Sequence, residues 1–166
     1  MGRINRLLLL IALAAMFACG CNSGSGKEAS TLPSSQAEVP RFTVSVQLSP
    51  KASAKLKKMK ETIIVSASLF GYPTRAAQSK AECSGEIGLG SVDKEMDEPG
   101  VAIFEGSTYD KSKLSLIENQ KPLLLINVFS GRKSSEDNLL DCSVFQDSVD
   151  RAVKDGIRID CKLIGE

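Results

Sequence analysis

Apolar and polar residues alternate strictly in two segments of the chain, residues 42–48 (FTVSVQL) and residues 157–163 (IRIDCKL). A period of two is typical of a β-strand with one buried and one solvated face. We therefore predict a strand in each segment and at least one sheet with a solvated face. This pattern disfavours a wholly parallel sheet, which would be covered on both sides.

Two other segments are apolar on both faces and predict central strands of a sheet. They are residues 62–70 (TIIVSASLF) and residues 122–129 (PLLLINVF). Shorter strand candidates are residues 86–92, 101–105 and 139–144.

Helix signals occur between these strands. Ser49 followed by Pro50 is a helix start, with an N-cap and a proline in the first turn, and it predicts a helix of about three turns over KASAKLKKMK. Asp110 can cap a short helix through Ile117, and residues 147–154 predict one or two helical turns. Residues 74–84 are polar and show no clear period.

Six or seven short strands with isolated short helices between them predict a mainly β fold, a single β-sandwich-like domain with short helical insertions. The alternative is an α+β fold of two layers, with the helices on one face of a sheet. We place this globular domain at residues 41–166, a length that supports one hydrophobic core.

The first residues have the character of an export signal. Arg3 and Arg6 precede a twelve-residue apolar stretch at positions 7–18. A membrane-spanning helix needs about 20 apolar residues, so this stretch predicts a signal peptide and not a membrane anchor. No later segment reaches eighteen uninterrupted apolar residues.

The segment Met16-Phe17-Ala18-Cys19-Gly20-Cys21 then resembles the lipobox of bacterial lipoproteins. The resemblance implies a signal peptide of residues 1–18 with a lipidated Cys19, or of residues 1–20 with a lipidated Cys21. Several acyl chains on that cysteine, palmitate among them, would hold the chain firmly on a membrane. Neither cysteine is followed by Asp, which for a Gram-negative host implies the outer membrane, with the protein facing the periplasm.

Residues 19–40 contain the lipidated N-terminus and a stretch rich in Ser, Gly and Pro. Such a composition has too few large apolar residues to offset the entropy of ordering. We expect these residues to form a flexible tether that contributes nothing to the core.

Three further cysteines are available for chemistry in an oxidising compartment. Cys142 and Cys161 lie in two strand candidates joined by a short connection, and we predict that they form a disulfide. Cys83 remains. It is either a reactive thiol or a partly buried small apolar residue, and the neighbouring Glu82 favours the second because a carboxylate raises the pKa of a thiol.

Composition excludes several functional classes. The chain has no histidine, which removes Ser-His-Asp, Cys-His and His-metal sites, and its formal net charge of +1 leaves no excess of positive charge for nucleic acid. The lysine run of residues 51–60 is best explained as a solvated helix face. The acidic residues Glu136, Asp137 and Asp141 lack the spacing of a calcium loop. We predict no metal, no cofactor and no catalytic residue.

Residues 48–73 (LSPKASAKLKKMKETIIVSASLFGYP), EDNLLDC and the final IRIDCKLIGE resemble a group of bacterial envelope lipoproteins for which no activity is established. This resemblance implies an envelope location and a single domain. The first functional hypothesis is a membrane-anchored, non-catalytic binding or accessory module with an envelope protein as its possible partner. The second is a small envelope enzyme that uses the thiol of Cys83 or a carboxylate near Asp137.

Overall fold

The computed structural model describes residues 35–166, so the predicted signal peptide and the candidate lipidation sites Cys19 and Cys21 lie outside the described residues. The described part is mainly β, as predicted. Its elements, in chain order, are β1 (Gln36–Glu38), β2 (Phe42–Leu48), α1 (Pro50–Met59), β3 (Ile63–Gly71), η1 (Arg75–Lys80), β4 (Ile87–Met96), β5 (Val101–Phe104), β6 (Thr108–Asp110), η2 (Lys111–Leu116), η3 (Glu118–Gln120), β7 (Leu123–Ser130), β8 (Leu140–Cys142), β9 (Phe145–Ser148), α2 (Val149–Asp155) and β10 (Ile157–Leu163).

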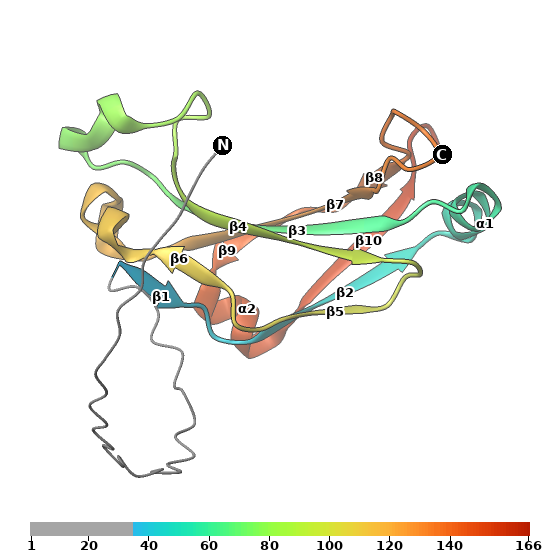
Figure 1. The fold of residues 1–166 in the computed structure, drawn as a ribbon, viewed down its shortest axis with the longest axis horizontal. Coiled ribbons are helices and arrows are strands. Elements are labelled where there is room, and N and C mark those ends of the chain that lie inside the picture. Colours follow the sequence, from blue (N-terminus) through green and yellow to red (C-terminus); the bar gives the residue numbers. More distant parts are fainter. Residues whose placement is uncertain (1–34) are drawn as a thin grey trace, which may run out of the picture. The chain divides into compact units, whose positions relative to one another are not determined.

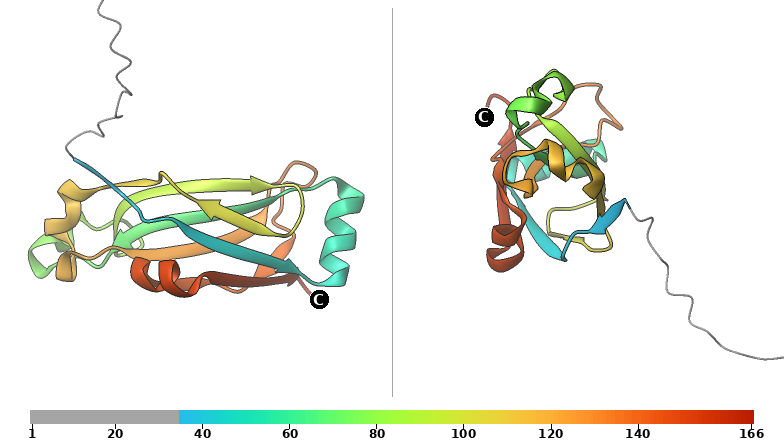
Figure 2. Two further views of the ribbon diagram at one scale, coloured as in Figure 1. Left: turned by 90° about the horizontal axis from the view of Figure 1, so that it is seen from below. Right: turned by 90° about the vertical axis from the view of Figure 1, so that its left-hand side faces the viewer.

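Two four-stranded sheets lie one over the other and form a β-sandwich (Figures 1 and 2). The first sheet has the strand order β5-β2-β10-β8, and the second has the order β4-β3-β7-β9. A small pair, β1 with β6, lies beside them. The β-sandwich-like fold is confirmed.

The core lies between the inner faces of the two sheets. Val44 and Ile159 of the first sheet are almost completely buried, as are Val65 and Ile126 of the second. Alternate residues of β2 and β10 point outward and are partly or fully exposed. The period-two pattern therefore arises because this sheet has one buried face and one solvent-exposed face.

The two strands with the strongest alternation are neighbours in space. β2 and β10 pair in parallel, with Val44 opposite Ile157, at the centre of the first sheet. β10 also pairs with β8 on its other side, in the antiparallel sense. Segments more than a hundred residues apart in the chain thus share the middle of one sheet.

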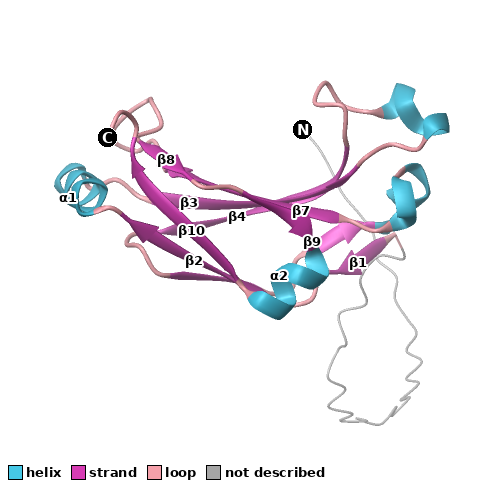
Figure 3. Ribbon diagram, turned by 180° about the vertical axis from the view of Figure 1, so that it is seen from behind, coloured by secondary structure: helices cyan, strands magenta, loops and turns pink. Residues whose placement is uncertain are grey.

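Helix α1 lies at one end of the sandwich, and β1 and β6 lie at the other (Figures 1 and 3). The predicted helix start is confirmed, because Ser49 Oγ accepts a hydrogen bond of 3.1 Å from the Ala52 backbone N–H. Ala52 and Leu56 are the buried residues of this helix. The helix ends at Lys60, whose left-handed backbone lets its N–H meet the carbonyl groups of Leu56 and Lys57.

Some boundaries differ from the sequence-based prediction. β1 falls within residues 19–40, and Val39 is 2% exposed, so the expectation that this segment contributes nothing to the core is wrong at Val39. The strand predicted at residues 139–144 is only β8, and the first residues of the predicted helix 147–154 belong to β9. Strands this short owe their form to their partners and have no period of their own.

Candidate functional site

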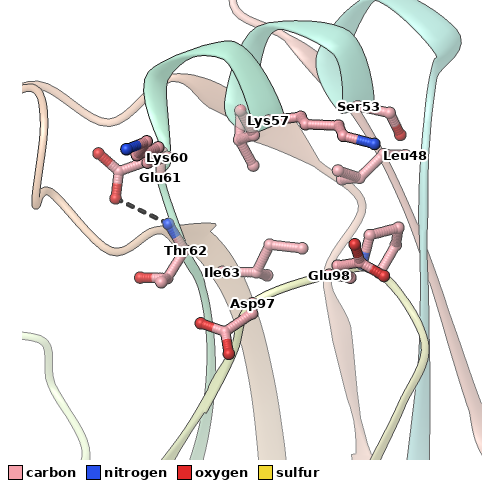
Figure 4. A pocket seen from close by; sticks show the side chains of 11 residues that line it. Leu48, Ser53, Lys57, Lys60, Glu61, Thr62, Ile63, Asp97 and Glu98 are labelled. Atoms are coloured by element: carbon pink, nitrogen blue, oxygen red, sulfur yellow. Dashed lines mark hydrogen bonds between the residues drawn. The ribbon is translucent and has the colours of Figure 1, made fainter.

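A cleft of about 470 Å³ opens at the α1 end of the sandwich, between the helix and the turn that connects β4 to β5 (Figure 4). Its walls come from four places in the chain: the end of β2, helix α1, the start of β3 and the turn. The lining residues are Leu48, Ser53, Leu56, Lys57, Lys60, Glu61, Thr62, Ile63, Asp97, Glu98 and Pro99.

The apolar part of the cleft is supplied by Leu48, Leu56, Ile63 and Pro99. Leu56 and Ile63 also belong to the buried core, so packing within the core fixes their positions. An apolar surface held in this way can accept an apolar group without rearranging.

Charges of both signs surround this apolar part. Lys57 comes from the helix and Lys60 from its C-cap, and Asp97 and Glu98 come from the turn on the opposite side (Figure 4). All four residues are exposed, and none of them forms an ion pair with another residue of the described chain. The cleft can therefore offer cations on one wall and carboxylates on the other to a ligand.

Glu61 forms the inner corner of the cleft and is 3% exposed. Its Oε1 accepts backbone N–H bonds from Thr62 and Lys133, both of 3.0 Å. Its Oε2 accepts bonds from the backbone N–H and the hydroxyl of Ser134, of 2.8 and 2.7 Å. The carboxylate thus fixes the start of the loop of residues 131–139 against the end of α1.

These hydrogen bonds set the protonation state of Glu61. Burial raises the pKa of the carboxyl group, but the bonds from Ser134, Lys133 and Thr62 together outweigh burial and lower the pKa to about 2. Glu61 is therefore ionised at neutral pH, with both oxygens occupied. It is an anchor for the loop, and it does not have the pKa of a general acid or base.

A second link fastens the same loop to β4. Lys133 Nζ lies 2.6 Å from Glu95 Oε1, and the hydroxyl of Thr62 donates to the same oxygen at 2.7 Å. The bonds from Lys133 and Thr62 lower the pKa of Glu95. Gly131 completes the junction, because a Cβ atom there would overlap the Thr62 hydroxyl oxygen. The inner wall of the cleft is therefore rigid.

The structure confirms the predicted bond between Cys142 and Cys161. The two residues lie directly opposite each other on β8 and β10, with their sulfur atoms 2.06 Å apart. The half-cystine at Cys161 is buried and belongs to the core.

Cys83 is a free thiol, and the expectation that it is partly buried is wrong. It lies exposed in the turn after η1, where Glu82 bends back to accept a bond from the Gly88 N–H. Asp137 lies in the loop between β7 and β8, at the opposite end of the sheets (Figure 1). The two alternative groups of the enzyme hypothesis therefore belong to separate places on the molecule.

The other charged groups singled out in the sequence are spread over the surface. Asp141 pairs with Lys162 at 3.5 Å, and Glu136 is exposed. Within residues 35–166, no group of three or more potential ligands could hold a metal ion. The lysines of α1 are exposed, as expected for a solvated helix face. Lys57 among them lines the cleft, together with the C-cap residue Lys60.

Sequence reasoning missed Glu61, Asp97 and Glu98. The one available signal was Glu61 itself, a charged residue placed directly before a strand that is apolar on both faces. Asp97 and Glu98 precede Pro99-Gly100 and have the composition of an ordinary exposed turn.

Comparisons with known proteins add no identity to this geometry. We found no match for the chain among protein-family models, curated proteins or solved structures. In the part of the chain that the structure describes, no helix is both long enough and apolar enough to cross a membrane.

Proposed function

We propose that this chain is a lipid-anchored, non-catalytic binding module of the bacterial cell envelope. The anchor is the lipidated Cys19, or Cys21 in the alternative, and the location is the outer membrane facing the periplasm. The support for this location is the resemblance of residues 16–21 to a lipobox after a signal-peptide pattern.

The ligand site is the cleft beside α1, and its ligand is a small zwitterionic amphiphile. The observation that carries this proposal is the presence of exposed charges of opposite sign on facing walls, without ion-pair partners among the described residues, above an apolar surface. Lys57 and Lys60 meet the anionic group of the ligand, Asp97 and Glu98 meet its cationic group, and Leu56 and Ile63 contact the apolar part.

Binding is tested with three probes that share a twelve-carbon chain: a phosphocholine, a sulfate and a trimethylammonium, each below its critical micelle concentration. The protein is the full lipidated chain in phosphatidylcholine nanodiscs, with empty nanodiscs as the blank. The zwitterion should bind most tightly. The substitution Lys57→Glu should weaken it about fivefold, since an exposed ion pair contributes up to ~1 kcal/mol.

The matched control is Lys58→Glu, which makes the same charge change on the exposed face of the same helix, outside the cleft. Ser53→Phe, which fills the cleft, should abolish binding while α1 stays folded. Equal binding of all three probes, or equal loss in the Lys57 and Lys58 variants, would contradict the proposal.

The anchor is tested by the intact mass of the protein purified from membranes. The first eighteen or twenty residues should be missing, and the new N-terminal cysteine should carry a diacylglycerol and acyl mass. Replacement of Cys19 by Ser should remove the lipid mass if Cys19 is the site, and replacement of Cys21 by Ser should do so in the alternative. A chain that still begins at Met1 without lipid contradicts the anchored module.

A further inference from the structure

β5 is one of the two edge strands of the first sheet, and its outer edge carries backbone groups that no described strand uses. The Val46 N–H donates to the Gly100 carbonyl at 2.8 Å, which makes these two residues a hydrogen-bonded pair of the β2–β5 ladder. Such pairs alternate along an antiparallel ladder, so Ala102 and Phe104 face β2 in the same way. The N–H and C=O groups of Val101 and Ile103 therefore point away from the sheet.

The same two residues expose large apolar side chains. Val101 is 59% exposed and Ile103 is 41% exposed, both on the outer face of the sheet. The strand itself is well fixed, because Ala102 and Phe104 are buried and the ring of Phe104 stacks on that of Phe42 with 4.9 Å between centroids. A rigid edge thus presents free hydrogen-bonding groups beside apolar side chains.

The other edge strands are protected and β5 is not. Of the other three edges of the two four-stranded sheets, β4 carries Asp93, Lys94 and Glu95 along its outer half. β8 carries Asp141, which is paired with Lys162, and β9 carries Asp147, which is paired with Arg151. Charged residues at an edge discourage pairing with another chain. β5 reads Val-Ala-Ile-Phe and has no charge, proline or bulge.

We propose that β5 is the docking edge for an extended segment of a partner protein, which adds as an antiparallel strand. The apolar residues of this partner segment lie at alternate positions, beside Val101 and Ile103. A basic residue follows them at the end of the segment that meets the turn before β5. Backbone hydrogen bonds supply affinity in this mode of recognition, and alternate side chains supply specificity.

The charges at the two ends of β5 indicate the charge of the partner segment. The turn before β5 holds Asp97 and Glu98 without an ion-pair partner in the described chain, whereas Glu105 after β5 lies 3.5 Å from Arg41. In a pair of β5 strands from two copies, centred on Ala102, Glu105 of each copy would lie beside Glu98 of the other. Because Glu105 is already paired with Arg41, a second copy brings no unpaired cation to Glu98, whereas a basic segment does.

The probe is a fluorescein-labelled peptide of alternating valine and serine with a lysine at its C-terminal end. In an antiparallel strand this end meets the turn before β5. In an antiparallel strand on β5, the valines lie opposite Val101 and Ile103 and their N–H groups face β5. A peptide methylated on the serine nitrogens should therefore bind the full lipidated chain in phosphatidylcholine nanodiscs. The isomer methylated on the valine nitrogens should bind at least about tenfold more weakly, because it has lost these donors. Fluorescence anisotropy gives both affinities.

Variants of β5 test the site itself. Ile103→Pro removes an outward N–H without touching the ladder to β2, and Ile103→Lys adds the charge that other edges carry, so both should weaken the peptide about tenfold or more. Glu98→Lys should weaken it several-fold. Lys57→Glu, in the cleft, should leave it unchanged, so that failure of the cleft proposal and failure of this one are distinguishable.

Equal affinity for the two methylated isomers, absence of saturable binding, or insensitivity to both Ile103 variants would overturn the proposal. Sedimentation of the nanodisc-free chain in detergent gives one further outcome. A dimer that Ile103→Lys dissociates would show that a second copy occupies this edge, and it would overturn the assignment to a basic partner segment.

Discussion

Glu61 shows how one buried carboxylate can organise a site without reacting. Its two oxygens hold the backbone of Lys133 and Ser134, and through them the loop of residues 131–139 against the end of α1. Replacement by glutamine turns one acceptor oxygen into a donor that faces N–H groups. We expect Glu61→Gln to lower the free energy of unfolding by ~1–3 kcal/mol at pH 7. Urea unfolding measures this loss, with Glu136→Gln, an exposed change in the same loop, as the control.

The ionisation of Glu61 also makes the free energy of unfolding depend on pH. The pKa of Glu61 falls from 4.5 to about 2 on folding, so the unfolded chain takes up the proton first as the pH decreases. The stabilisation is complete above pH 4.5 and is lost as the pH falls towards 2, by an amount on the order of 3 kcal/mol. Between pH 5 and pH 2.5 the wild-type chain should therefore lose more stability than Glu61→Gln. Equal changes in the free energy of unfolding with pH for the two proteins would contradict this role of Glu61.

Helices and strands could be predicted where their own sequence, and not a neighbouring strand, determines their form. β2, β3, β7, β10 and α1 were predicted because their length and periodicity record which face is buried. β1, β6 and β9 have three or four residues each, and they are strands only because a partner lies beside them. The cleft was missed for a related reason. Its charged residues come from a helix and a turn that are more than thirty residues apart, and each alone resembles a solvated surface.

The disulfide between β8 and β10 is the element-scale feature whose contribution is easiest to measure. Replacement of Cys142 and Cys161 by serine should lower the free energy of unfolding by ~3 kcal/mol, the value expected for a loop of about twenty residues. Peptide mapping without reduction should find these two cysteines linked. Iodoacetamide under native conditions should modify Cys83 alone among the three cysteines of the described domain. Protection of Cys83 before denaturation would contradict its exposed position.

For the whole molecule, the two proposed binding surfaces can be placed relative to the N-terminal side of the described domain. β1, the first strand in the part of the chain that the structure describes, lies at the end of the sandwich opposite α1 (Figure 1). If the chain is anchored as proposed, the cleft and the turn before β5 lie at the end of the domain opposite the strand that is nearest to the anchor in the sequence. This arrangement suits a module that presents its binding surfaces to the compartment and not to its own membrane.

The central position of β10 also has a consequence for biogenesis. The first sheet has the order β5-β2-β10-β8, so β2, which is made early, has no neighbour on one side until residues 157–163 arrive. In the proposed export, the chain would cross the membrane from its N-terminus onward, and β2 would emerge with one open edge well before β10, which covers it. The first sheet is complete only when β10 enters between β2 and β8. If the chain is exported as proposed, the domain would therefore have to stay unfolded, or be shielded by a chaperone, for nearly the whole of its passage.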